Sequence, residues 1–263
     1  MASRIRLLLV LSLIVCCGKL LQAQQLSNVA FENESLTYVI SYKWGLVQKD
    51  AGKAKLTLLN RNGYYEIKLA AATLPWADKV FCVRDTLSSW VKRDGFKPLK
   101  YIKTTHEGGK YNRDYLVYSY DGNKVTGSCN RTKVRDGNVK KSTFTSTVSG
   151  KTFDMLSIFY YIRSLDFGAM KKGKSVKANI LSGSSPEVIT ISNQGVENVK
   201  MPDGKKYQCY HIRFTFTTDS GKSDSYPMDT WITVDAPYIP VKLVGTLPIG
   251  KVQAFLTGAK VKS

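Results

Sequence analysis

The stretch LTYVISYKW at residues 36–44 decides the fold class of this chain. Large apolar or aromatic side chains occupy every second position from Leu36 to Trp44, and mainly smaller or polar side chains lie between them. A period of two residues is typical of a β-strand with one buried face, because successive side chains of a strand point to opposite sides. The sequence therefore predicts a strand here, with a core on one side of it.

The same alternation returns along the chain, and residues that favour tight turns separate the strand-like runs. Such turns are expected at Asn62-Gly63, Asp94-Gly95, Asp121-Gly122 and Pro202-Asp203-Gly204, because glycine, asparagine and aspartate accept the backbone angles that short hairpins need. Short turns join antiparallel neighbours. The pattern predicts a mainly β protein over residues 24–263: a single domain formed by one antiparallel, strongly curved sheet or by an open or closed barrel.

Residues 1–23 have the layout of a secretory signal peptide. Two arginines precede an apolar run over residues 7–15, and LQA at residues 21–23 offers a small-residue cleavage site. The apolar run is shorter than the roughly 20 residues that a membrane-spanning helix needs. Cys16 and Cys17 raise the alternative of a lipid anchor, but neither follows the small residue that lipoprotein signals favour. We expect an exported protein, periplasmic or in the cell envelope.

The chain is strongly basic, with 39 Lys and Arg against 20 Asp and Glu and a formal net charge of +19. A solvated basic surface is the plain explanation of this charge. Attraction to anionic envelope material, such as lipid headgroups or acidic glycan, is the functional alternative and fits a peripheral association with the envelope. Because the lysines are scattered singly and the chain is expected to be exported, no nucleic-acid partner is predicted.

Residues 154–168, DMLSIFYYIRSLDFG, differ from the strand-like runs around them. Asp154 or Thr152 is suited to cap the start of a helix here, and Gly168 is suited to end it. We expect one short helix that packs its apolar arc against the concave side of the sheet. Five large side chains share that arc at the spacing of an amphipathic helix, namely Met155, Ile158, Phe159, Ile162 and Leu165.

Arg163 lies at the border of that apolar arc, with Tyr160 and Tyr161 beside it. A guanidinium at such a border is partly removed from water and needs hydrogen-bond acceptors. An internal carboxylate such as Asp85 or Asp235 is one expected partner, because buried charges are usually paired within the protein. An anionic ligand is the other, and the sequence leaves both open.

The sequence offers little support for catalysis or for a bound metal or cofactor. Only two histidines are present, and there is no CxxC or HExxH motif, so no metal site is predicted. The motifs of serine hydrolases, phosphate-binding loops and dinucleotide-binding folds are absent from the sequence as well. We therefore predict no catalytic residues, no cofactor and a protein that is not an enzyme. Cys82, Cys129 and Cys209 are expected to be buried free thiols.

Three runs of residues carry a resemblance to a known family. The first is FENESLTY at 31–38, with Trp44-Gly45 and Ala51-Gly52 after it. The second is the helix, with Asp154, Ser157, Tyr160, Tyr161 and Arg163. The third is DTWITVD at 229–235, followed by Pro240-Val241 and GKVQAFL at 250–256. Together they resemble an uncharacterised exported family, domain of unknown function 3108 (DUF3108), over most of the chain after residue 23. The resemblance implies curved antiparallel sheets or open barrels, akin to envelope carriers that hold lipid in a β half-barrel closed by helices, and it implies no catalytic residues.

The aromatic content suggests a function for such a sheet. The chain contains 15 tyrosines, 10 phenylalanines and 4 tryptophans. An ordinary core accounts for most of them, but a sheet curved around one helix also leaves room for an apolar cavity. We expect a non-catalytic exported protein that binds or carries an amphiphilic envelope ligand, a lipid or glycolipid. The candidate contacts are Arg163, Tyr160, Tyr161 and Trp231.

Two other functions stay open. A structural or interaction protein would dock to cell-wall glycan or to a protein partner through a sheet edge or a basic face. A hydrolase acting on envelope glycan comes third, with Asp85, Asp94 or Asp235 as candidate carboxylates. An apolar cavity behind residues 155–165, open at one end, is expected of a carrier, whereas a packed interior there argues against it.

Overall fold

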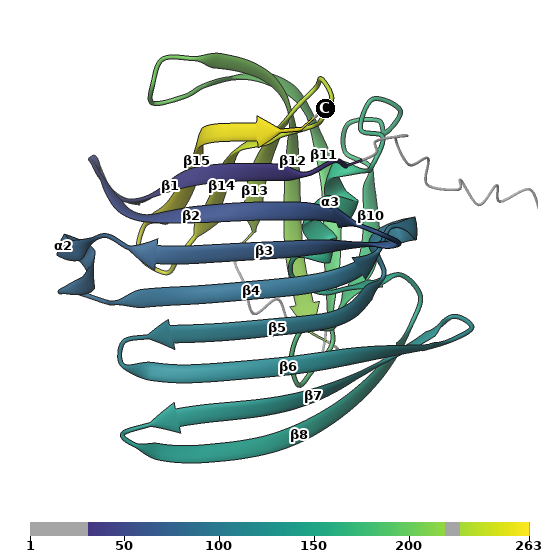
Figure 1. Cartoon of the computed structure of the whole chain (residues 1–263). Helices are drawn as coiled ribbons and strands as arrows, with labels where there is room; N and C mark the ends of the chain where they lie inside the picture. The colour runs from purple at the N-terminus through teal and green to yellow at the C-terminus, as the bar shows by residue number, and fades with distance from the viewer. Residues whose placement is uncertain (1–30, 219–226, 263) are drawn as a thin grey trace, which may run out of the picture.

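The computed structural model describes residues 31–218 and 227–262, so the signal peptide predicted at residues 1–23 lies outside the described part. One sheet of fifteen strands dominates that part (Figure 1), in the order β8-β7-β6-β5-β4-β3-β2-β1-β15-β14-β13-β12-β11-β10-β9. All neighbouring strands are antiparallel except β9 and β10, which are parallel. The strands are β1 (Glu34–Trp44), β2 (Val47–Arg61), β3 (Tyr64–Thr73), β4 (Val83–Lys92), β5 (Pro98–Glu107), β6 (Lys110–Asp121), β7 (Lys124–Arg135), β8 (Asn138–Ser149), β9 (Thr152–Phe153), β10 (Ser175–Ile180), β11 (Glu187–Lys200), β12 (Lys206–Thr218), β13 (Met228–Thr233), β14 (Pro240–Thr246) and β15 (Lys251–Val261).

Three short helical elements accompany the sheet: α2 (Pro75–Asp78), the 3-10 turn η1 (Asp94–Phe96) and α3 (Ser157–Arg163). Among the described residues, none of these helices is long and apolar enough to cross a bilayer. Only α3 lies within the sheet's curve (Figure 1), whereas α2 lies at one end of the strands.

The predicted turns lie between strands. Asn62-Gly63 joins β2 to β3, and Asp121-Gly122 joins β6 to β7. Gly63 and Gly122 have φ values of 86° and 55°, the left-handed region that glycine adopts without steric cost. Asp94-Gly95 lies in η1 between β4 and β5, and residues 202–204 connect β11 to β12. Each of these turns reverses the chain, which explains why consecutive strands are antiparallel neighbours.

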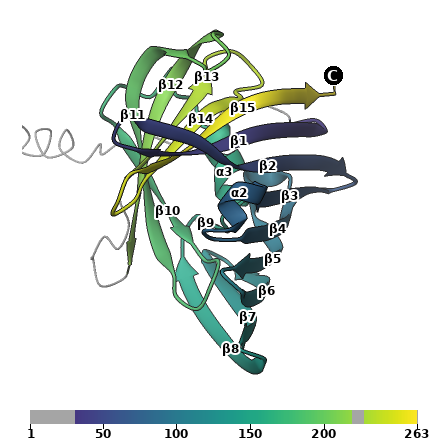
Figure 2. The ribbon, with the colours of Figure 1, turned by 90° about the vertical axis from the view of Figure 1, so that its left-hand side faces the viewer.

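The sheet closes on itself almost completely. Strands β2–β8 form one wall and β10–β14 the other, with α3 between them (Figure 1 and Figure 2). On one side the walls join through the ladder between β1 and β15. On the other side the edges meet through hydrogen bonds to loop carbonyls: the Tyr118 hydroxyl donates to Leu181 O (2.5 Å) and the Ser146 hydroxyl to Ser184 O (3.3 Å). The predicted mainly β, strongly curved sheet with a short helix is thus confirmed.

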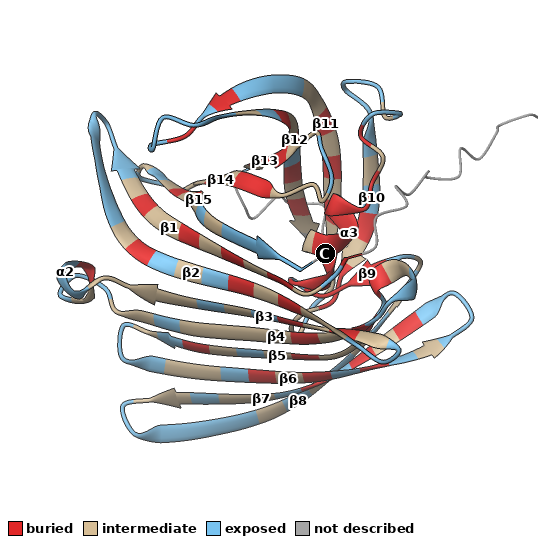
Figure 3. Cartoon of the chain, turned by 45° about the horizontal axis from the view of Figure 1, so that its top comes forward, coloured by how far each residue is buried: buried red, intermediate tan, exposed pale blue. Residues whose placement is uncertain are grey.

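The helix is more deeply buried than its sequence pattern predicts. Arg163 and Tyr161 are 1% and 2% exposed, although the wheel places Tyr161 on the polar side, and Met155 from the expected apolar arc is 39% exposed. The prediction of an amphipathic helix was wrong because both walls enclose α3, so that every residue of α3 except Phe159 is buried and no polar face is exposed to water. Figure 3 shows α3 and its flanking residues largely in the colour of buried residues.

Asp154 caps the helix, as predicted. Its carboxylate accepts the backbone N–H groups of Leu156 and Ser157 (both 2.8 Å) and the hydroxyl of Ser89 on β4 (2.5 Å). In return, the Ser157 hydroxyl accepts the N–H of Asp154 (2.8 Å). The bond to Ser89 also ties the start of α3 to the sheet.

The space around α3 is occupied by an aromatic and aliphatic core. Phe96 stacks on Tyr65 with ring centroids 5.7 Å apart, and Phe31 meets Phe96 and Tyr160 edge to face at 5.6 and 5.3 Å. These rings belong to one continuous cluster of buried residues that extends from β1 to β13. The interior beside the helix is therefore packed, which argues against an internal cavity as the place of a ligand.

Candidate functional site

Arg163 is bound by the protein itself. Its Nη1 and Nη2 atoms donate to the two carboxylate oxygens of Glu34 on β1, at 2.6 and 3.0 Å. Its Nε and Nη2 atoms also donate to the carbonyls of Tyr238 (2.9 Å) and Pro237 (3.1 Å). The side chains of Arg163 and Glu34 are 0% and 1% exposed, so the guanidinium presents no surface to a ligand.

The two carboxylates expected as partners of Arg163 lie elsewhere. Asp85 is on β4 and accepts the backbone N–H of His106 (3.2 Å), while Asp235 lies in the exposed connection between β13 and β14. The sequence did contain a signal for the true partner. Glu34 shares the core-facing side of β1 with Leu36 and Tyr38, and a lone charge on a buried face needs a buried partner.

Tyr160 and Tyr161 also make contacts inside the core. The Tyr160 hydroxyl donates to Glu34 Oε1 (2.6 Å), and the guanidinium carbon of Arg163 lies 5.0 Å from the Tyr160 ring centroid. Burial, together with the nearby Glu34 carboxylate, raises the pKa of Tyr160 well above its usual value. Tyr161 stacks on Phe153 with ring centroids 4.4 Å apart. Arg163 and Tyr160 thus form a closed cluster around the Glu34 carboxylate, whereas Tyr161 packs on Phe153.

Trp231 lies on the other face of the sheet from this cluster. It belongs to a second, smaller group of buried side chains that includes Phe255, whereas its neighbour Ile232 belongs to the main core. The Trp231 ring stacks on His211 at 4.6 Å, Lys242 Nζ lies 4.4 Å from its centroid, and its indole N–H donates to Glu197. The four predicted contact residues therefore do not form one site.

Cys209 and His211 lie two positions apart on β12, on the same face of the strand. His211 Nε2 lies 2.7 Å from Asp229 Oδ1. Cys209 is a buried free thiol, as Cys129 is, while Cys82 is partly exposed. In the described ranges 31–218 and 227–262, no three His, Cys, Asp or Glu side chains gather into a group that could hold a metal ion.

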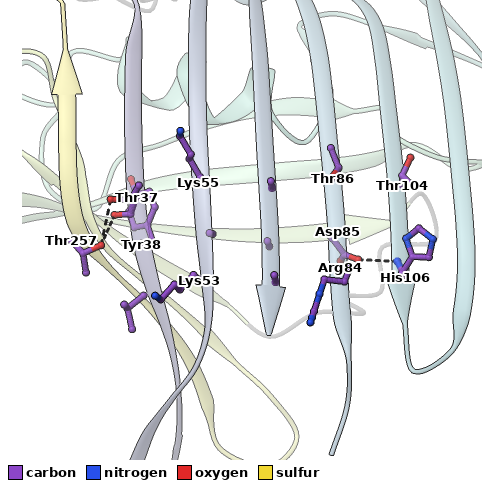
Figure 4. A pocket seen from close by; sticks show the side chains of 15 residues that line it. Thr37, Tyr38, Lys53, Lys55, Arg84, Asp85, Thr86, Thr104, His106 and Thr257 are labelled. Atoms are coloured by element: carbon purple, nitrogen blue, oxygen red, sulfur yellow. Dashed lines mark hydrogen bonds between the residues drawn. The ribbon is translucent and has the colours of Figure 1, made fainter. Parts of the chain in front are cut away.

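An open groove of about 880 Å³ crosses strands β1 to β5 beside β15 (Figure 4). Its floor is made by Ala70 and Ala72 of β3, whose small side chains leave a hollow between the longer ones on both sides. Ala71, between them, points its side chain to the opposite face. Register explains the arrangement, because Ala70 lies opposite Lys55 and Thr86, and Ala72 lies opposite Lys53 and Arg84.

The side chains of the groove belong mainly to the outer face of the sheet. Tyr38 points to the core, and Ala54 lies opposite it across the β1–β2 ladder. Lys53 and Lys55 flank Ala54 in sequence, so they point to the opposite, outer face. Both lysines are exposed. A ligand can therefore reach the groove without any opening of the core.

The groove has a positive flank and a hydroxyl-rich lining. Within the described part of the chain, neither Lys53 nor Lys55 takes part in an ion pair. Arg84, on the far side of the alanine floor, is held by Asp78 (Nη2 to Oδ2, 2.7 Å). Four threonines add hydroxyl groups, namely Thr37, Thr86, Thr104 and Thr257. This combination suits a ligand with an anionic group and an apolar part.

Asp85 contributes a carboxylate whose protonation is unusual. Burial, and next the nearby Glu107 carboxylate, raise the pKa of Asp85 to about 6. Asp85 lies opposite Ala71 and Thr105, and Thr105 is buried. The side chain of Asp85 therefore belongs to the inner side of the sheet, behind the groove floor. The groove was not predicted from the sequence. Its signal was a run of three alanines in a strand of otherwise large residues, paired with a strand that carries two lysines.

Comparisons with known proteins agree with this architecture. A family model described as a protein of unknown function (DUF3108) matches residues 37–257. Among solved structures, a crystal structure of a β-barrel-like protein of domain of unknown function DUF1849 from Brucella abortus is similar, with a TM-score of 0.61 and 11% sequence identity, covering 89% of this chain and 100% of that chain. At that identity the likeness concerns the fold alone. No curated protein matches the sequence.

Proposed function

The chain belongs to the DUF3108 family of proteins of unknown function. We propose that it is a non-catalytic protein that binds an anionic amphiphile, a lipid or glycolipid, in the groove on β1 to β5. The observation that carries the proposal is the alanine floor between Lys53, Lys55 and Arg84. Export to the envelope, where such ligands occur, is part of the same proposal and rests on the pattern of residues 1–23.

The chemistry of the groove divides a ligand into two parts. The methyl groups of Ala70 and Ala72 offer apolar surface to an acyl chain, while Lys53 and Lys55 offer ammonium groups to a phosphate or carboxylate. The volume of about 880 Å³ lies in the range of small-molecule pockets, which is roughly 300–1,000 Å³. A site on the outer face is also compatible with the aromatic and aliphatic side chains that pack around α3.

The proposal is tested with short-chain lipids that stay monomeric in water, so that a bilayer does not take part. Native mass spectrometry and calorimetric titration should detect binding of dihexanoyl phosphatidylglycerol to the protein. The zwitterionic dihexanoyl phosphatidylcholine should bind more weakly. Ala70→Trp fills the floor of the groove and Lys53→Ala/Lys55→Ala removes its charge, so each should weaken binding at least tenfold. Lys177→Ala, on the distant strand β10, is the matched control and should bind as the wild type does.

Two results would count against the amphiphile. Unchanged affinity in Ala70→Trp would place the lipid outside the groove. Binding of an acidic oligosaccharide with no response to either lipid would instead support the alternative of docking to cell-wall glycan, through the same lysines and threonine hydroxyls.

A further inference from the structure

Exposed apolar side chains are concentrated at one end of the barrel. Of the thirteen large hydrophobic residues exposed in the described ranges, eight lie in or beside three connections: the β1–β2 turn, the β3–β4 connection with α2, and the β14–β15 turn. The most prominent are Trp44 (64% exposed), Leu46 (103%), Val47 (64%), Val80 (81%), Phe81 (53%) and Ile249 (65%). Single exposed apolar residues are ordinary, but such a concentration marks an interaction surface. We call these three connections the apolar tips.

The three tips lie at the same end because of strand register and direct contacts. The Tyr42 hydroxyl at the end of β1 donates to Ile249 O in the β14–β15 turn (2.8 Å). The indole N–H of Trp76 in α2 donates to Asp50 O at the start of β2 (2.8 Å), and Lys49 Nζ lies 3.8 Å from the Trp76 ring centroid. Figure 2 looks onto this end, with α2 and the β1–β2 and β14–β15 turns facing the viewer.

Lysines accompany the apolar tips. Lys43, Lys49, Lys79 and Lys251 are all exposed in or beside the same connections. Lys43 lies directly opposite Lys251 in the β1–β15 ladder, an arrangement that is destabilising unless an anion lies nearby. The acidic groups there are engaged within the chain, since Asp50 accepts the Ser41 hydroxyl (2.6 Å) and Asp78 pairs with Arg84. This end of the barrel therefore combines projecting apolar side chains with excess positive charge.

We propose that the apolar tips dock the protein onto an anionic bilayer surface. Trp44, Leu46 and Phe81 enter the boundary between headgroups and acyl chains, and the lysines beside them contact anionic headgroups. A second copy of the chain fits this end poorly, because two such surfaces would bring lysines against lysines. The net charge of +19 favours approach to an anionic membrane over the whole protein.

The docking surface goes beyond the proposed ligand site and does not depend on it. The two are nevertheless adjacent, because Ala72 and Arg84 of the groove lie on β3 and β4, the strands that the connection with α2 joins. A protein docked by its tips would hold the groove close to the membrane from which an amphiphile is taken.

Co-sedimentation with vesicles tests the proposal. The wild-type protein should bind vesicles of phosphatidylglycerol and phosphatidylcholine at low ionic strength, and much less at high salt or with phosphatidylcholine alone. Leu46→Ser/Phe81→Ser removes two apolar tips and should lower the partition coefficient at least tenfold. Val117→Ser/Val196→Ser is the matched control, because both valines are exposed (44% and 53%) and lie on β6 and β11, away from the three connections, and it should bind as the wild type does.

Further variants separate docking from ligand binding. Lys43→Gln/Lys251→Gln should weaken binding to anionic vesicles at least fivefold and reduce its salt dependence. Lys53→Ala/Lys55→Ala should keep at least half of the vesicle binding, even where it loses the short-chain lipid. Equal binding of the tip variant and its control, or binding of the wild type to neutral vesicles as strongly as to anionic ones, would overturn the proposal. Circular dichroism and melting temperature establish that each variant is folded.

Discussion

Glu34 and Arg163 hold β1 and α3 together through two hydrogen bonds of 2.6 and 3.0 Å, although 129 positions separate them in the sequence. Both side chains are shielded from water. The pair therefore fixes the position of the enclosed helix against one strand of the sheet, and Tyr160 reinforces it by donating to the same carboxylate.

Arg163→Leu should lower the free energy of unfolding by roughly 3–5 kcal/mol, because it leaves the buried Glu34 carboxylate without its counter-charge. Adding Glu34→Leu to this variant should recover part of the loss. Urea unfolding followed by tryptophan fluorescence measures both effects. The control is Arg213→Leu, which breaks an ion pair with Asp229 whose arginine is 47% exposed and should cost less than about 1 kcal/mol. If Arg163→Leu costs no more than this control, the pair does not anchor the helix.

Asp154→Ala should destabilise the protein by about 3 kcal/mol, because it removes the cap of α3 and leaves the buried Ser89 hydroxyl without its acceptor. Asp154→Asn keeps an oxygen for the N–H groups of Leu156 and Ser157, and its amide can donate to Ser89. The asparagine variant should therefore lie within about 1 kcal/mol of the wild type. Chemical denaturation of both variants decides this, and equal losses would mean that the charge, rather than the cap, is what α3 needs.

The stability should depend on pH through Asp85. Its folded-state pKa of about 6 exceeds the ordinary value of 3.8, so between these limits the folded protein binds more protons than the unfolded chain. The contribution of Asp85 to stability is thus present below pH about 4 and falls as the pH rises to about 6. Asp85→Asn should abolish this decline and raise stability at pH 7 by about 1 kcal/mol, allowing for solvent screening at a partly exposed site. Melting temperatures from pH 3.5 to 7.5 measure the effect, and parallel curves for both proteins would contradict it.

The three described cysteines should differ in reactivity. Burial raises the pKa of Cys129 to about 11 and that of Cys209 to about 12, so both remain protonated thiols at pH 8. Cys82 is partly exposed and should react first with iodoacetamide in the native protein. Peptide mapping after labelling with and without urea checks this, and modification of Cys129 or Cys209 before Cys82 in the native state would show that these strands open readily.

The strands and their turns could be predicted because their signals are local. The alternation in residues 36–44 and the glycines at 63 and 122 act over a few residues, so a short window of sequence contains them. The helix was located for the same reason. The environment of α3 could not be predicted. A helical wheel assumes that one face of the helix is exposed to water, but the second wall of the barrel, made by residues far along the chain, covers that face.

The contacts that distinguish this protein depend on register across the whole sheet. Glu34 meets Arg163 only because the curvature of the whole sheet brings β1 beside the enclosed helix. No local pattern specifies which carboxylate reaches the arginine. The groove likewise requires Lys53, Ala72 and Arg84 to lie in one row across three strands. Each row follows from the preceding turns, and one residue of slip would move these side chains to the other face.

The pairing of β1 with β15 also determines when the sheet is completed during synthesis. Thr37 lies opposite Gly258, 221 positions away. Contacts so distant in sequence form slowly, because a long loop must close before they contribute. Until the last strand has left the ribosome, β1 and β14 each present an unpaired edge that other nascent chains can bind. A chain that stops before Lys251 should therefore aggregate, even though its first fourteen strands have been made.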